Sequence, residues 1–154
     1  MKSKNVITTE LLMTIVFSLL FSFFLASCGN EMPELVSVDD ILIVDGGTFL
    51  LSDYRNVLVE FEEEKTTNNI DDGEDAVEAA VTVWRDMYYY EESKKPNGRP
   101  HDPLQLLEKI VFKYDAQNEC WLVYGEFPES PPVAGVRSHM IIKSDGTVLA
   151  VWLE

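Results

Sequence analysis

The chain has 154 residues, and its 27 Asp and Glu residues against 12 Lys and Arg residues give a formal net charge of −15. A surface of that charge repels the phosphates of nucleic acids, so nucleic acid is excluded as a partner. It favours a basic protein partner, or simply solubility.

The first 28 residues divide into three zones. Lys2 and Lys4 place positive charge at the start, and an almost wholly apolar run, Leu11–Ala26, follows. The run ends in the sequence Leu-Ala-Ser-Cys at residues 25–28. A basic start, an apolar helical core and a small-residue exit are typical of a secretory signal peptide. The apolar run is shorter than the ~20 residues that a membrane-spanning helix needs.

Residues 25–28 resemble the lipobox of bacterial lipoproteins. The resemblance implies cleavage between Ser27 and Cys28 and attachment of acyl chains such as palmitate to Cys28. Residues 1–27 are then a lipoprotein signal peptide, residues 28–38 a lipidated tether and residues 39–154 a single domain. The protein is expected in the bacterial cell envelope, lipid-anchored to a membrane outside the cytoplasm, with inner and outer membrane both open. An uncleaved anchor helix is the alternative.

Cleavage changes the charge and the cysteine count. It removes two Lys and one Glu, which leaves 10 basic and 26 acidic residues and a net charge of −16. Of the two cysteines, lipidation occupies Cys28, so Cys120 has no partner for an intramolecular disulfide. An unpaired cysteine in an oxidising compartment is expected to be buried.

The domain begins with short β-prone runs. Residues 41–44 and 48–52 are separated by Asp-Gly-Gly at 45–47, a pattern that predicts a β-hairpin because the turn needs positive φ. Residues 57–61 alternate weakly, which predicts a third strand. The polar stretch 66–73 is expected to be a loop.

A helix is predicted over residues 75–91, because apolar side chains recur at helical spacing along one side. Asp71 or Asp72 can cap it. The spacing places Met87 and Tyr88 on the buried face and Tyr89 on the outer face, where an exposed tyrosine could contact a partner protein. The predicted buried face also contains Ala76, Val77, Ala80, Val81, Val83 and Trp84.

The remainder predicts strands. Residues 109–114 and 120–127 are separated by a turn at 115–118, and residues 136–143 and 147–153 form a hairpin around Ser-Asp-Gly at 144–146. One amphipathic helix packed on an antiparallel β-meander, preceded by a signal-peptide helix, defines the α+β class.

A search for catalytic chemistry finds no catalytic residues. His101 and His139 have no Cys, Asp or Glu at metal-ligand spacing, so no metal site is predicted. There is no phosphate-binding glycine loop and no serine-nucleophile elbow, and no cofactor is implied. The protein is therefore expected not to be an enzyme.

Residues 72–152 resemble a family of bacterial immunity proteins with a nuclear transport factor 2-like (cystatin-like) fold. Three segments carry the resemblance: the helix Asp75–Tyr88, the run from Trp121 to Pro128 with its Gly and Pro, and the terminal hairpin from Ile141 to Leu149. Where the family favours Gly-Gly and then Pro-Tyr, this chain has Arg137 and His139. Together with Tyr89, these two residues are the candidate partner contacts.

The resemblance implies a non-enzymatic protein that binds and neutralises a toxin. The lipid anchor places that event at the envelope, and the net charge favours a basic toxin. The first alternative is a generic envelope lipoprotein that acts as a binding or assembly module. The second is a small-ligand-binding or enzymatic domain of the same fold.

Overall fold

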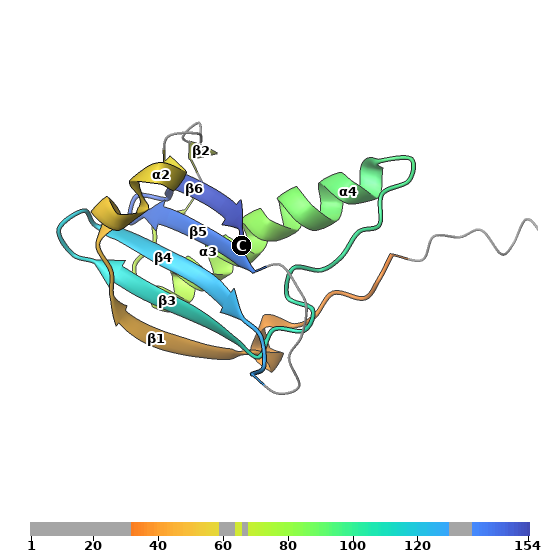
Figure 1. The fold of residues 1–154 in the computed structure, drawn as a ribbon, viewed down its shortest axis with the longest axis horizontal. Coiled ribbons are helices and arrows are strands. Elements are labelled where there is room, and N and C mark those ends of the chain that lie inside the picture. Colours follow the sequence, from red (N-terminus) through yellow and green to blue (C-terminus); the bar gives the residue numbers. More distant parts are fainter. Residues whose placement is uncertain (1–31, 59–63, 66–67, 130–136) are drawn as a thin grey trace, which may run out of the picture. The chain divides into compact units, whose positions relative to one another are not determined.

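A computed structural model describes residues 32–58, 64–65, 68–129 and 137–154. These residues form an α+β fold, as the sequence predicts. The helical run α3–α4 lies on one face of a sheet, and the short helix α2 lies on the other (Figure 1). Residues Pro33–Glu154 make up one compact unit.

The sheet combines an antiparallel meander with one parallel strand. The order of its strands is β1-β3-β4-β5-β6-β2. The four strands β3 to β6 pair antiparallel in sequence order, which confirms the predicted meander. The strand β1 instead pairs parallel to β3, which the sequence did not indicate. The bounds are β1 Leu42–Thr48, β2 Glu64–Lys65, β3 Lys109–Asp115, β4 Cys120–Glu126, β5 Ser138–Lys143 and β6 Thr147–Leu153.

The hairpin predicted at residues 45–47 is wrong, because these residues lie inside β1. Its register with β3 shifts between Asp45 and Thr48, which makes the glycines a strand irregularity instead of a turn. Gly47 has φ +81°, and its N–H donates to Asp45 Oδ1 over 2.7 Å. A Cβ on Gly46 would lie 2.6 Å from Val111 Cγ1, so glycine permits the close approach to β3.

Helical segments follow β1 in place of the predicted third strand. The 3₁₀ turn η2 spans Leu51–Tyr54 and α2 spans Arg55–Leu58, so the start of the predicted strand 57–61 is helical. The remainder of that prediction, residues 59–61, lies outside the described residues. A further 3₁₀ turn, η1, spans Val38–Asp40.

The predicted long helix is present, and it is longer at both ends. It consists of α3 (Gly73–Arg85), a π-helical turn η3 (Asp86–Tyr90) and α4 (Glu91–Lys94). Asp72 is the N-cap, and its Oδ1 accepts from the N–H groups of Glu74 and Asp75 over 2.9 and 3.0 Å. This confirms one of the two predicted caps.

The π-helical turn overturns the predicted orientation of the side chains that follow it. The N–H of Glu91 donates to the carbonyl of Asp86, an i→i+5 bond that inserts one residue into the turn. The buried face therefore moves by one position: Tyr89 is buried, with 1% of its surface exposed, whereas Met87 is 38% exposed. Tyr88 is half-buried against the core, as predicted.

The main core lies between α3 and the sheet. Trp84, Ala76, Val77 and Ala80 are fully buried on the helix. They meet apolar side chains of four strands, namely Ile110, Val123, Met140, Ile142 and Val148. Burial of the apolar face of α3 against the sheet supplies most of the stability of the helix.

The remaining predictions concern the ends of the chain. The signal peptide 1–27, its cleavage site and Cys28 lie outside the described residues. Within the described part of the chain, no helix is long and apolar enough to span a bilayer. Residues 33–38, assigned from sequence to a tether, contact the domain: Val36 and Val38 pack against the main core.

Candidate partner-binding surface

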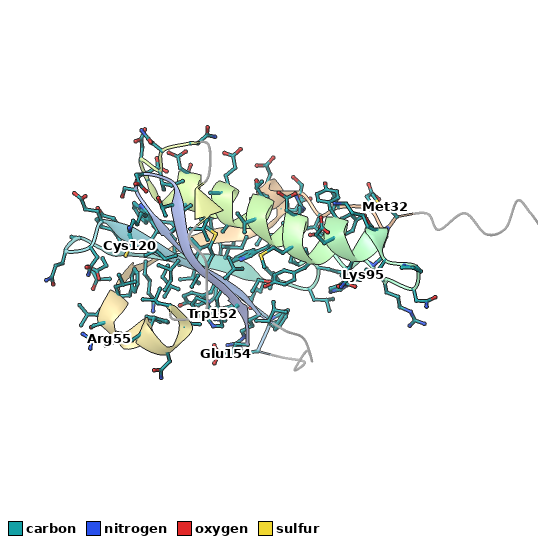
Figure 2. All side chains as sticks on the ribbon, turned by 90° about the horizontal axis from the view of Figure 1, so that it is seen from above. Met32, Arg55, Lys95, Cys120, Trp152 and Glu154 are labelled. Atoms are coloured by element: carbon teal, nitrogen blue, oxygen red, sulfur yellow. The ribbon has the colours of Figure 1, made fainter. Side chains whose placement is uncertain are left out.

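Among the described residues, those that cover the sheet face opposite α3 lie at one end of that face. There Leu51, Tyr54 and Leu58 pack on a second cluster formed by Phe49, Cys120, Leu122, Ile141 and Leu149, and Tyr124 and Trp152 border the same cluster. Figure 2 shows Arg55 of α2 on the opposite side of the sheet from the α3–α4 run. Cys120 is fully buried in this cluster, as predicted, and burial raises the pKa of its thiol to about 12.

The other end of this face carries half-exposed and exposed side chains. Alternation along each strand places them on the face that carries Leu122 and Ile141. We call this region the open sheet surface, and it consists of Leu42, Lys109, Lys113, Tyr124, Glu126 and Trp152, with His139 beneath them. Leu42 is 62% exposed, an unusual degree for a leucine in a strand.

His139 is the centre of an aromatic stack on this face. Its ring lies 5.6 Å from the centroid of Tyr124 and 4.8 Å from that of Trp152, with interplanar angles of 17° and 15°. His139 Nε2 lies 3.4 Å from an Oε atom of Glu154. With 7% of its surface exposed, His139 is not the surface contact that the sequence suggested. It stacks between Tyr124 and Trp152, which are both half-buried.

The other two predicted contacts are Arg137, which is exposed, and Tyr89, which is buried. Arg137 is exposed and stands beside β5, where its N–H and carbonyl pair with the backbone of Glu154 over 2.8 and 2.9 Å. It lies two residues from His139 and therefore at the margin of the open sheet surface. Tyr89 is buried beneath the helical run, and its hydroxyl donates to the Pro33 carbonyl over 2.5 Å. The prediction of Tyr89 as a contact is therefore wrong.

The open sheet surface carries a net charge of about +1, because it contains Lys109 and Lys113 but only one acidic residue, Glu126. Lys109 Nζ lies 2.9 Å from Glu126 Oε2, across a directly paired position of β3 and β4. The hydrogen bond to Glu126 raises the pKa of Lys109. Lys113 Nζ lies 5.5 Å from the ring centroid of Tyr124, within reach of a cation–π interaction. Large aromatic side chains of this kind are typical of the centre of a protein interface.

A hollow lies on the outer side of α3, away from the open sheet surface. Its volume is about 320 Å³, and it is lined by Asp75 and Glu78 of the helix together with Asn69 and Ile70 of the preceding loop. Asp75 also accepts a hydrogen bond from the N–H of Asp71 over 3.1 Å, so its carboxylate already stabilises the start of the helix. Asp75 is thus accounted for by its place in the first turn of the helix, where a carboxylate is stabilised by the free N–H groups and the helix dipole.

Sequence reasoning missed Tyr124 and Trp152, although a signal was present. Both are aromatic residues at the positions of their strands that point away from the α3 core, where an antiparallel sheet usually places polar side chains. His101 is exposed, and the described residues contain no group of three His, Cys, Asp or Glu side chains that could hold a metal ion.

Comparison of the whole chain with known protein families, with curated proteins and with solved structures finds no match.

Burial lowers the pKa of His139, which predicts a stability change near neutral pH. Because the folded protein favours neutral His139, the unfolded chain binds a proton more readily below about pH 6.5, and stability is lost as the pH falls through that value. His139→Phe keeps an aromatic ring in the stack and cannot titrate. Urea unfolding at pH 7.5 and 6.0 should show a larger loss in the wild-type protein than in the variant. Parallel losses would contradict the assignment.

Proposed function

We propose that this protein is a lipid-anchored envelope protein that binds and neutralises a toxin through its open sheet surface, without catalysis. The proposal includes lipidation at Cys28 after cleavage at Ser27. The observation that carries it is the Tyr124–His139–Trp152 stack, which places two large aromatic side chains at the boundary of core and solvent. Tyrosine and tryptophan in such positions supply much of the binding energy of protein interfaces.

The charge distribution supports a two-part recognition of a basic toxin. The mature net charge of −16 attracts a basic protein over a distance and increases its rate of association. The open sheet surface itself carries no net negative charge, because Lys109 pairs with Glu126 and Lys113 adds a further positive charge. Short-range contact there depends on aromatic packing more than on charge. Association is therefore expected to slow as salt is added, with a smaller effect on dissociation.

The envelope location limits which toxins this protein could neutralise. An anchored protein outside the cytoplasm meets toxins that act on peptidoglycan or lipid, or toxins in transit. As part of the proposal, the domain is a variant of the nuclear transport factor 2-like fold. The small-ligand alternative has less support, because the space between α3 and the sheet is filled by Trp84 and its neighbours, which are fully buried.

The experiment first asks whether a neighbouring gene encodes a secreted toxin, and then uses that toxin in a killing assay with and without the protein. Wild-type protein should protect, and Trp152→Ala should weaken toxin binding about thirtyfold, which corresponds to about 2 kcal/mol. Leu42→Ala should weaken binding to a smaller degree. Leu50→Ala is its matched control, because Leu50 is 57% exposed beyond the other end of β1. Unchanged killing in the presence of correctly localised protein would remove the toxin hypothesis and favour a general envelope binding module.

A further inference from the structure

The segment that leads into the domain is fastened by three side chains. The hydroxyl of Tyr89 donates to the Pro33 carbonyl over 2.5 Å. The N–H of Val36 donates to Asp102 Oδ2 over 2.7 Å, and Arg85 donates from Nη2 to the Val36 carbonyl. Both polar backbone groups of Val36 are therefore paired with side chains that come from far along the sequence. We call these contacts the clasp.

The clasp is rigid because its side chains also hold one another. Arg85 donates to both carboxylate oxygens of Asp102, from Nε over 3.2 Å and from Nη2 over 3.0 Å. The N–H of Leu104 donates to Asp102 Oδ1 over 3.2 Å. Asp102 is 1% exposed and the Arg85 side chain 16% exposed, so water competes little for these bonds. The entering chain is thus part of the folded domain from Pro33 onward.

This fastening shortens the free part of the tether. From Cys28 to Pro33 there are five residue steps, which span at most about 17 Å when fully extended. A tether free as far as residue 39 would span about 37 Å. The end of the domain near Pro33 therefore has to stay within a short distance of the acyl chains at Cys28.

The surface at that end has the composition of a membrane-interface segment. Tyr90, whose ring lies 5.2 Å from that of Tyr89, is 37% exposed. Lys94, Lys95 and Arg99 follow it and are exposed, and they are three of the ten basic residues of the mature chain. Lys94 and Lys95 pair with Glu91 and Glu92, and the exposed Glu34 beside Pro33 offsets Arg99, which leaves a local charge of about zero in a strongly acidic protein. We call Tyr90, Lys94, Lys95 and Arg99 the anchor-proximal surface.

The acidic groups are concentrated elsewhere in the domain. Asp71, Asp72, Glu74 and Asp75 surround the start of α3, at the opposite end of the helical run from Lys94. Figure 1 shows α4 at one end of this unit and the turn between β3 and β4 at the other. An anionic membrane repels the acidic end more strongly than the nearly neutral end, so charge and tether length favour the same orientation.

We infer that the anchored protein stands on the membrane in one orientation, with the anchor-proximal surface against the lipid headgroups and the β3–β4 turn directed away. This inference rests on the proposed lipidation of Cys28. The clasp sets the orientation because it ends the tether at Pro33, and Tyr90 with the basic side chains occupies the interface. The open sheet surface is thereby held at a constant height above the lipid.

The orientation can be measured with nitroxide labels on full-length lipidated protein in vesicles of phosphatidylethanolamine and phosphatidylglycerol. One label is placed at Lys94→Cys and another at Gln117→Cys, an exposed position in the β3–β4 turn. Cys120 is buried and does not take the label. The accessibility of the label at residue 94 to a water-soluble nickel complex is measured on vesicle-bound lipidated protein and on the same domain without acyl chains in buffer. It should be several-fold lower on the vesicles. The label at residue 117 should not change.

A variant with a longer tether tests whether the clasp and the short tether cause the orientation. Insertion of a six-residue Gly-Ser segment after Gly29 leaves the folded domain intact and should abolish the difference between the two labels while the protein stays on the vesicles. Equal nickel accessibility at residues 94 and 117 of the bound original protein, or an unchanged difference after the insertion, would overturn the inference. Failure to bind vesicles at all would overturn the lipid anchor itself, together with this inference.

Discussion

Arg85→Ala is expected to lower the free energy of unfolding by about 3–5 kcal/mol, the usual cost of removing one partner of a buried ion pair. The variant leaves the Asp102 carboxylate 1% exposed without its cation. It also removes the donor to the Val36 carbonyl, so the entering segment is loosened as well. Urea unfolding followed by circular dichroism measures the loss.

Two further variants define the cause of this loss. Lys94→Ala breaks an exposed pair with Glu91, and it should cost no more than about 1 kcal/mol. The double variant Arg85→Met with Asp102→Leu removes both charges, but it leaves both polar backbone groups of Val36 without their side-chain partners. It should therefore recover only part of the stability lost by Arg85→Ala. A loss below about 1 kcal/mol for Arg85→Ala would show that water already solvates Asp102, and that the clasp is weak.

The parts of the fold that the sequence predicted correctly are those determined by local pattern. Alternation in residues 109–114 predicted β3, and the Ser-Asp-Gly turn at 144–146 predicted the start of β6, both almost to the residue. Asp72 was a predicted cap because its carboxylate satisfies N–H groups two and three residues ahead. Such contacts depend on neighbours along the chain, which the sequence displays.

The incorrect predictions depend on partners far along the chain. Gly46 and Gly47 are hairpin residues by local propensity, but β3 supplies β1 with a parallel neighbour, and the glycines relieve the contact with Val111. A regular helix of 100° per residue would place Tyr89 on the exposed side. The π-helical turn that begins at Asp86 adds one residue and rotates Tyr89 to the buried side. Its burial also requires the Pro33 carbonyl, 56 residues away. No local pattern encodes either pairing.

The candidate surface was predicted only in part. Arg137 and His139 were named from the sequence, and the residues that carry most of the aromatic surface, Tyr124 and Trp152, were not. They come together because the register opposes Tyr124 to His139 and His139 to Trp152 on three adjacent strands. Register is set by the pairing of whole strands, so the stack becomes visible only once β4, β5 and β6 are aligned.

Cys28→Ala is expected to release the protein almost completely from the membrane fraction. Without the thiol, no acyl chains are attached, and each buried methylene contributes about 0.8 kcal/mol to anchoring. The folded unit begins at Pro33, so the substitution should leave the circular dichroism and the unfolding midpoint of the domain unchanged. Fractionation of cells, followed by immunoblotting of membrane and soluble fractions, measures the release.

Cys120→Ala is the matched control for this prediction, since it removes the other cysteine of the chain. Cys120 is buried in the second core cluster, so its substitution affects packing and should leave the protein in the membrane fraction. Retention of Cys28→Ala in the membrane fraction would instead favour an uncleaved anchor helix over residues 11–26. Release of Cys28→Ala with loss of protection against a toxin would show that position at the membrane is part of the function. Release with full protection would place the binding event within the domain alone, on surfaces such as the Tyr124–His139–Trp152 stack.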